Sequence, residues 1–162
     1  MKRMALSTGG QQSINIATIE QIQSLTDQLR HAAAEQGFRA LQLYECRTKD
    51  DSRAFRQWFD GLSITQRIWL PKHTNTDRAD EIQQLLGRET ELVVYDASNG
   101  VDPRLLAAAA GTLLAGGQFL LLTPPLLHWH NTYDAEYDTE NSRFLARLSA
   151  QIQQHCLSLI HI

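Results

Sequence analysis

The sequence predicts an α/β domain of three layers, in which a mainly parallel sheet carries helices on both faces. Strand-like apolar segments alternate with helical segments along the chain, and this alternation is typical of parallel strands joined by helical crossovers. Residues 92–95, Leu-Val-Val-Tyr, are apolar without interruption, as expected for a strand buried on both faces. The chain has 162 residues, 43% of them hydrophobic, which fits a single Rossmann-like domain.

The first segments predict a helix behind an irregular start. Residues 1–17 have no firm period and include two adjacent glycines, so we expect a flexible segment there and a single domain over residues 18–162. Thr18 can cap a helix, because Gln21 stands three residues later in the capping-box position. Apolar residues then recur every three or four positions until Gly37 ends the helix.

Two strands enclose the next predicted helix. Residues 38–46 and 64–70 are the strand-like segments, and Pro71 ends the second one because proline cannot donate a hydrogen bond to a sheet. The helix between them begins in the polar cluster at residues 50–52 and stops at Gly61.

The middle of the chain predicts a third helix and a third strand. Either Thr76 or Asp77 caps the helix after a polar loop, and Gly87 ends it. The strand covers residues 91–96, and the Asn-Gly pair at residues 99–100 marks a turn beyond it.

The last third predicts two helices around a fourth strand. Asp102 and Pro103 form a strong helix start, because aspartate caps and proline fits the first helical position. This helix is expected to run until the glycine pair at residues 116–117, ahead of a strand over residues 118–122. A polar and aromatic loop over residues 126–141 precedes the final helix. Its apolar face consists of Phe144, Leu145, Leu148, Ile152 and Cys156.

Composition and charge narrow the classes of function. The 15 basic and 18 acidic residues give a net charge of −3, unlike the basic footprint of a dedicated DNA-binding module. Most basic residues are arginine, whose planar fork suits phosphate, although ordinary surface pairing explains the same excess. Cys46 and Cys156 have no metal-binding spacing and are interpreted as reduced structural thiols. No signal peptide or membrane helix is evident, so we expect a cytoplasmic protein without a membrane partner.

Candidate site residues follow the strands, because parallel α/β sheets bind ligands at the carboxyl ends of their strands. This edge is expected to gather Asp96, Ser98, Asn99, His128 and Trp129 into an interaction surface. Asp96 ends its strand as the magnesium-binding acids of nucleotide hydrolases do. Since no phosphate-binding loop accompanies it, the simpler interpretation is that Asp96 caps the following turn.

The segment around Trp129 carries two further hypotheses. His128 and His130 form a His-x-His pattern that can hold a metal ion on a loop, although no third ligand is evident. Trp129, if exposed, can stack on a base or cover the edge of the sheet. The sequence contains no GxGxxG, GxxxxGK[ST] or GxSxG motif, so no catalytic, cofactor-binding or metal-binding residue is assigned.

The stretch from Leu86 to Pro125 carries a resemblance to a known family. It contains LGRE, then VVYDA, a Gly-x-Asp-Pro helix start, an AGTL-x-AGG run and an apolar strand that ends in Thr-Pro. In these features the chain resembles the amino-terminal domain of the tRNA(Met) cytidine acetyltransferases, over about residues 38–150.

The resemblance implies an accessory domain of a larger enzyme. Such enzymes acetylate N4 of the wobble cytidine of elongator tRNA(Met), using acetyl-CoA and ATP with magnesium. The resemblance places those cofactors in a helicase-like ATPase module and an acetyltransferase module in cis, both outside this chain. The chain ends within an apolar pattern, which also suits an excised domain. We therefore expect no activity from this chain alone, and a role in positioning tRNA or the other modules.

Two alternatives remain open. One is a stand-alone Rossmann-like enzyme that acts on a small molecule, and the absence of a phosphate-binding loop argues against it. The other is a scaffold domain that binds no ligand.

Overall fold

The described residues of this protein form a sheet of five parallel strands. The computed structural model describes residues 19–71, 78–98, 100–131, 139–155 and 159–161. Its strands are β1 (Ala40–Glu45), β2 (Arg67–Leu70), β3 (Thr90–Asp96), β4 (Leu113–Thr123) and β5 (Leu159–His161). They lie in the order β2-β3-β4-β1-β5, and each neighbouring pair is parallel. The predicted parallel sheet is confirmed.

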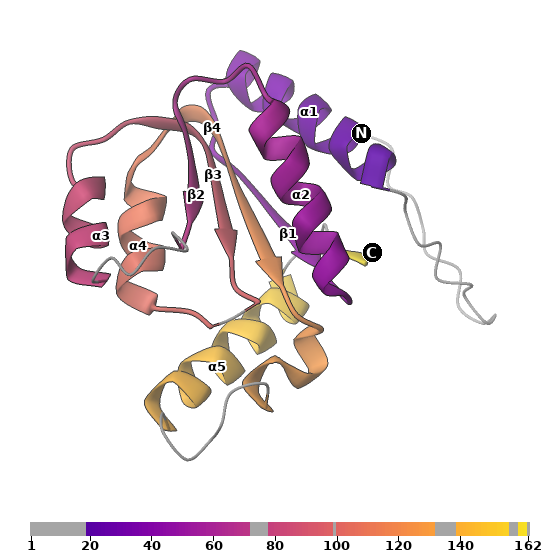
Figure 1. Ribbon diagram of the computed structural model, residues 1–162, viewed down its shortest axis with the longest axis vertical. Helices are drawn as coiled ribbons and strands as arrows, with labels where there is room; N and C mark the ends of the chain where they lie inside the picture. The colour runs from indigo at the N-terminus through magenta and orange to yellow at the C-terminus, as the bar shows by residue number, and fades with distance from the viewer. Residues whose placement is uncertain (1–18, 72–77, 99, 132–138, 156–158, 162) are drawn as a thin grey trace.

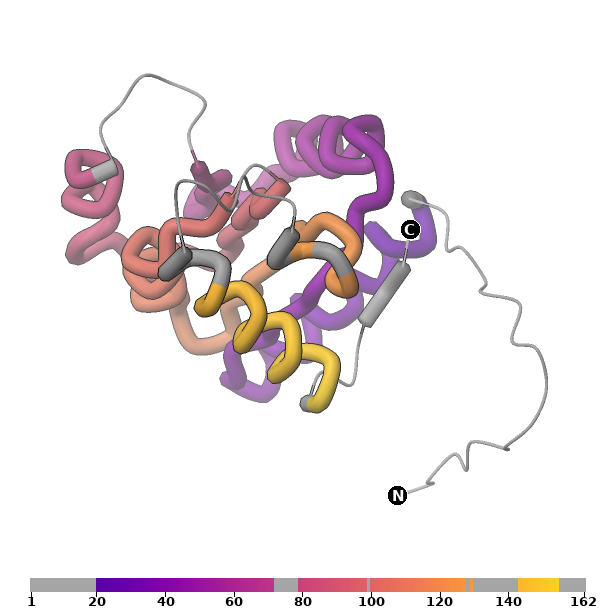
Figure 2. Tube along the Cα trace, turned by 90° about the horizontal axis from the view of Figure 1, so that it is seen from below, coloured from indigo at the N-terminus to yellow at the C-terminus, as the bar shows by residue number. Residues whose placement is uncertain are grey.

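Helices cover both faces of this sheet (Figure 1). They are α1 (Ile19–Gln36), α2 (Lys49–Gly61), α3 (Arg78–Leu85), α4 (Pro103–Gly111) and α5 (Thr139–His155), with a short 3-10 helix, η1 (Leu126–Asn131), after β4. The core contacts place α1 and α2 on one face, and α3, α4 and α5 on the other. Figure 2 looks toward the carboxyl ends of the strands, with α5 in the foreground. This is the predicted three-layer, Rossmann-like architecture.

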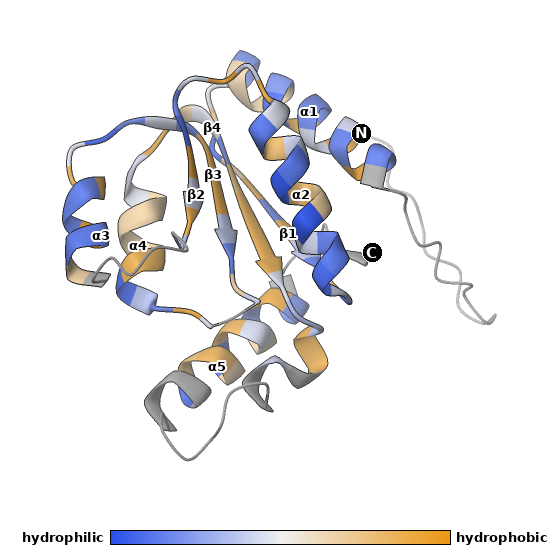
Figure 3. Ribbon diagram, in the orientation of Figure 1, coloured by the Kyte–Doolittle hydropathy of each residue, from blue (hydrophilic) through white to orange (hydrophobic). Residues whose placement is uncertain are grey.

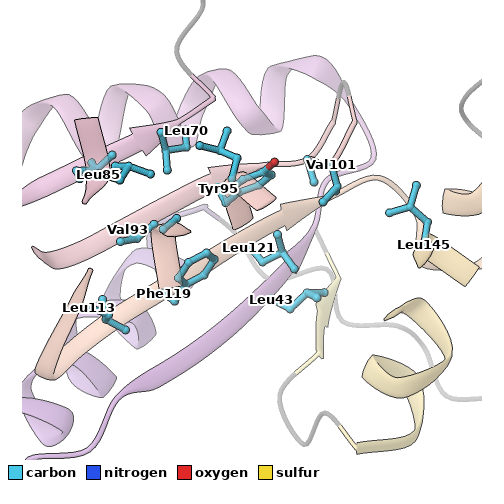
Figure 4. Packing of buried hydrophobic residues seen from close by; sticks show 14 of the residues in the cluster. Leu43, Leu70, Leu85, Val93, Tyr95, Val101, Leu113, Phe119, Leu121 and Leu145 are labelled. Atoms are coloured by element: carbon cyan, nitrogen blue, oxygen red, sulfur yellow. The ribbon is translucent and has the colours of Figure 1, made fainter. Parts of the chain in front are cut away.

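Alternate residues of each strand build two halves of the core. Toward α3, α4 and α5, the strands present Leu43, Ile68, Leu70, Val93, Tyr95, Phe119 and Leu121 (Figure 4). Toward α1 and α2, they present Tyr44, Trp69, Leu92, Val94, Leu120 and Leu122. Because both faces are covered, the strands are apolar almost throughout, whereas the outer faces of α2 and α3 are hydrophilic (Figure 3).

Buried polar contacts fix α1 against the sheet. The hydroxyl groups of Thr26 on α1 and Tyr44 on β1 are hydrogen-bonded to each other. The side-chain amide of Gln118 on β4 donates to the carbonyl oxygen of Thr26 at 3.1 Å and to the side chain of Gln42. Burial raises the pKa of Tyr44 to about 12, so its hydroxyl is protonated at neutral pH. An unsatisfied buried donor costs about 1–3 kcal/mol, and these pairs therefore favour one placement of α1.

The glycine pair at residues 116–117 lies inside a strand, so the predicted helix end is wrong. α4 ends at Gly111, and β4 already begins at Leu113. Close packing is the physical reason, because a Cβ atom on Gly116 would lie 2.9 Å from the Cα atom of Ala34 in α1. The pair therefore lets β4 pass beneath α1.

Other boundaries differ less. β2 begins at Arg67, three residues later than predicted. The 3-10 helix η1 occupies part of the expected loop after β4. An additional strand, β5, follows the final helix. The predicted flexible segment 1–17 lies outside the described residues and stays a prediction. Within the described part of the chain, no helix combines the length and the apolarity that crossing a membrane requires.

Candidate functional site

The sheet creates a crevice at the carboxyl ends of β1 and β4. These two strands are neighbours, but the chain leaves β1 toward α2 on one face and leaves β4 toward η1 and α5 on the other. Connections that diverge to opposite faces leave the strand ends uncovered between them, and open α/β sheets bind ligands at such points. The topology therefore places a candidate site beside the first turn of α2.

A cleft of 570 Å³ occupies this position, and we name it the strand-end cleft. Its lining comes from the β1–α2 turn, the first two turns of α2, β2, the end of β3, and the loops after β3 and β4. The lining residues are Cys46, Arg47, Thr48, Lys49, Ser52, Arg53, Arg56, Trp69, Asp96, Ser98, Pro124 and Pro125.

The first turn of α2 is held by a complete capping box. Thr48 is the N-cap, and its hydroxyl accepts a hydrogen bond from the backbone amide of Asp51 at 3.3 Å. The carboxylate of Asp51 accepts in return from the amides of Thr48 and Arg47, at 2.8 and 2.9 Å. This reciprocal pattern fixes the direction in which the helix starts. The start of α2 is thus a rigid wall of the cleft.

Asp96 links this wall to the end of β3. Its side chain is buried, with one oxygen accepting from the Ser52 hydroxyl at 2.6 Å and the other from the backbone amide of Ser98 at 3.0 Å. The contact with Ser98 confirms the interpretation of Asp96 as the cap of its turn. Both carboxylate oxygens are therefore engaged in structural hydrogen bonds, one of them across the cleft.

The lining of the cleft is basic. It contains four cationic side chains, Arg47, Lys49, Arg53 and Arg56, and one carboxylate, Asp96. Arg53 pairs with Asp50 at 2.6 Å, and Arg56 pairs with Asp60 at 3.2 Å, both on the surface of α2. The guanidinium carbon of Arg56 also lies 5.1 Å from the ring centre of Trp69, a cation–π distance. The chain carries a net charge of −3, so this positive lining is local.

Cys46 lies in this cleft as an unreactive thiol. It is free and buried, and desolvation by burial raises its pKa to about 12, with smaller contributions from the negative charges of Asp96, Asp51 and Glu45. The thiolate is the nucleophilic form of cysteine, and a raised pKa removes it at neutral pH. The interpretation of Cys46 as a structural thiol is therefore supported.

We expect iodoacetamide to label Cys46 in the folded protein at pH 8 more than about a hundredfold more slowly than in the unfolded chain. The raised pKa keeps the thiolate fraction low until the pH approaches 12, so labelling rises only in strong alkali. The Cys156→Ser variant isolates the signal of Cys46. The reference is the labelling rate of the same variant when it is unfolded in about 8 M urea. Equal rates in the two states would contradict the buried thiol.

The structure places the residues predicted for this edge in different surroundings. Asp96 and Ser98 both line the strand-end cleft. Asn99 lies outside the described residues, and the side chain of His128 does too, although its backbone belongs to η1. The hypothesis of a His-x-His metal site therefore stays a prediction.

The expectation that Trp129 lies on the surface is wrong. Its side chain is fully buried and packs in the core cluster with Leu126 and Leu145. The 3-10 helix η1 directs both Leu126 and Trp129 inward, so the Trp129 ring supports the core and offers no face to a base. Stacking of a nucleotide on Trp129 is excluded by this burial.

Sequence reasoning missed the basic side chains and Ser52. The Thr48-Lys49-Asp50-Asp51 start directly follows a buried strand, and this pattern predicts a helix N-terminus at the ligand-binding edge. The flanking Arg47, Arg53 and Arg56 gave no comparable signal, because arginines at such spacing are usually solvated. Among the residues that the structure describes, no group of three His, Cys, Asp or Glu side chains is placed to hold a metal ion.

Comparison with known proteins matches the chain to one family. The family model described as "tRNA(Met) cytidine acetyltransferase TmcA, N-terminal" matches residues 16–161. Relatives with the name tRNA(Met) cytidine acetyltransferase TmcA include one from Citrobacter koseri, 47% identical over 55 residues, which are 34% of this chain and 8% of the relative. The Nitrosococcus halophilus protein is 27% identical over 124 residues, 74% of this chain and 17% of the relative. The Salmonella typhimurium protein is 41% identical over 63 residues, 39% and 9% of the two chains. The matches thus cover only a small part of each relative.

Proposed function

Since the chain belongs to the family of amino-terminal domains of tRNA(Met) cytidine acetyltransferases, we propose that it is an accessory, non-catalytic domain of such an enzyme. In this proposal the whole enzyme acetylates N4 of the wobble cytidine of elongator tRNA(Met), and this domain helps to position the tRNA. The matches to less than a fifth of each relative support a domain role, because most of the relatives' length lies outside the match.

The observation that carries the positioning role is the basic lining of the strand-end cleft. Four cationic side chains gather at one edge of a domain whose net charge is negative. Contacts to phosphate and sugar fix the register and orientation of a bound nucleic acid without reading its sequence. A small basic site therefore suits a domain that orients tRNA for chemistry performed by another module.

Catalysis and cofactor binding are assigned to other modules of the same polypeptide. The sequence of this chain has no phosphate-binding loop, whose backbone amides supply most of the grip on a nucleotide triphosphate. In the cleft, Asp96 is engaged by Ser52 and Ser98, and Cys46 is held as a thiol. We propose that acetyl-CoA and ATP with magnesium bind to a helicase-like module and an acetyltransferase module in cis, in the cytoplasm. Calorimetry of this chain with ATP should then give no micromolar binding.

The tRNA dependence of the whole enzyme tests the proposed function. Removal of residues 1–150 from the full-length enzyme is expected to raise several-fold the tRNA concentration that gives half-maximal acetylation. Linked weak sites add to one another through their effective concentration, and the deletion removes one of them. The Michaelis constant for acetyl-CoA should stay unchanged, because its pocket lies elsewhere.

The comparison requires a truncated enzyme that is folded, as judged by its acetyl-CoA binding. If the folded truncation shows the same tRNA dependence as the full-length enzyme, the positioning role is wrong. The scaffold interpretation, in which the domain binds no ligand, would then account for its presence.

A further inference from the structure

We propose that the strand-end cleft binds a backbone phosphate of an RNA strand, between the start of α2 and the side chains of Arg47 and Lys49. This inference rests on the proposed function for the identity of the RNA, and it adds the chemical group that is bound and the residues that bind it. The site is a phosphodiester clamp, distinct in kind from a nucleotide-triphosphate pocket.

The start of α2 supplies backbone donors. The capping box uses the amides of Thr48 and Asp51, and within the described part of the chain the amides of Lys49 and Asp50 have no such partner. The first amides of a helix lack intrahelical acceptors and lie at the positive end of the helix dipole. Together these effects favour an anion beside Lys49.

Two exposed cations flank these amides. The side chains of Arg47 and Lys49 form no ion pair within the described residues, whereas Arg53 and Arg56 pair with carboxylates on α2. The stacking of Arg56 on Trp69 holds a third cation in the wall of the cleft. Arg47 and Lys49 are therefore the charges most available to a phosphate, and arginine can bind it with two parallel hydrogen bonds.

A second, independent observation is an unsatisfied donor in the wall of the cleft. Trp69 is 6% exposed and lines the cleft, and its indole N–H is buried without a hydrogen-bond partner among the described residues. Buried donors are nearly always paired in folded proteins, so this unpaired N–H in the cleft wall points to a ligand that carries acceptors.

The acidic groups near the cleft limit the strength of this site. Asp96 and Asp51 direct their carboxylate oxygens to Ser52 and to backbone amides, yet they keep their negative charge nearby. A single phosphodiester carries one negative charge and meets less repulsion from them than a triphosphate does. We therefore expect weak, salt-sensitive binding of an RNA strand and no tight binding of ATP.

Binding of a single-stranded RNA oligonucleotide to the 162-residue chain tests this inference. The Arg47→Ala/Lys49→Ala variant is expected to bind about tenfold more weakly at low salt. The slope of log K against log salt should become shallower by about 0.7, since the site binds one phosphate and each phosphate contact on a single strand contributes about 0.7 to that slope. The matched control is Arg39→Ala/Arg88→Ala, which removes the same charge from a groove at the opposite edge of the sheet.

Several outcomes decide the inference. Equal losses in the cleft variant and the control, or an unchanged salt slope in the cleft variant, would overturn it. Inorganic phosphate is the second probe: if it binds in a cleft-dependent manner and RNA does not, the site serves free phosphate and the RNA assignment is wrong. The inference is supported if RNA binding depends on the cleft and inorganic phosphate is only a weak competitor. Melting temperatures of both variants control for folding, and Lys49→Glu provides a single-residue check.

These outcomes are separable from the test of the proposed function. RNA binding that is insensitive to the cleft overturns this inference and leaves the tRNA-positioning role intact. Cleft-dependent RNA binding, together with an unchanged tRNA requirement of the truncated enzyme, overturns the proposed function and leaves the phosphate site intact.

Discussion

Replacement of Trp129 by alanine is expected to lower the free energy of unfolding by about 3–5 kcal/mol, the cost of deleting a large aromatic side chain from a packed core. Trp129 has no exposed surface and belongs to the cluster that joins the sheet to α4 and α5. The truncation therefore leaves a cavity that the neighbouring strands cannot fill, and η1 loses its anchor. Urea unfolding of the two proteins, followed by circular dichroism, measures the difference.

The neighbouring residue Leu127 provides the matched control. It lies in the same 3-10 helix, but its side chain is 70% exposed. Leu127→Ala should change the free energy of unfolding by no more than about 0.5 kcal/mol, as is usual for surface substitutions. If Trp129→Ala proves as mild as Leu127→Ala, the burial of Trp129 in the core is contradicted.

Gly116→Ala is expected to destabilise the domain by about 2–5 kcal/mol, the sum of two separate penalties. A left-handed backbone, here with φ of +81°, costs a non-glycine residue about 1–2 kcal/mol. The added Cβ atom would also lie 2.9 Å from the Cα atom of Ala34, and overpacking of this kind costs about 1–3 kcal/mol. Since the obstacle is backbone, α1 must move away from the sheet to accept the methyl group.

Gly37→Ala separates the two penalties. Gly37 has a similar φ of +72°, but nothing lies within 4 Å of a Cβ atom built there. The variant should therefore lose only the conformational part, about 1–2 kcal/mol. The difference between the two midpoints of unfolding measures the contact between β4 and α1. If Gly116→Ala and Gly37→Ala were equally destabilising, that close approach would play no part in stability.

The fold was predictable because local and global signals agree over most of the chain. The uninterrupted apolar strand at residues 92–95 and the Asp102-Pro103 helix start are each read correctly from a few residues. The glycine pair at residues 116–117 was misread, because glycine ends helices and also permits close packing in strands. Only the position of Ala34, distant in sequence, decides between these roles.

The site was less predictable than the fold for a similar reason. Asp96 and Ser98 follow a strand and could be placed at the carboxyl edge from the topology alone. The basic lining comes from α2, and the fact that Arg56 faces Trp69 depends on how that helix packs. Trp129 was misplaced because η1 has only six residues, and the three-residue spacing of its buried Leu126 and Trp129 is too short a pattern to mark an inward face.

The position of β1 in the sheet has a consequence for the order of folding. Among the described residues, β1 is the first strand, yet it pairs only with β4 and β5; Ala40 faces Gln118, and Glu45 faces Thr123. β1 therefore has no sheet partner until β4 has been synthesised. In contrast, β2 pairs with β3 and β3 pairs with β4, so these three strands can assemble in the order in which they leave the ribosome. Insertion of β1 closes the longest loop in the sheet, and because closure of long loops slows folding, we expect this step to limit the folding rate.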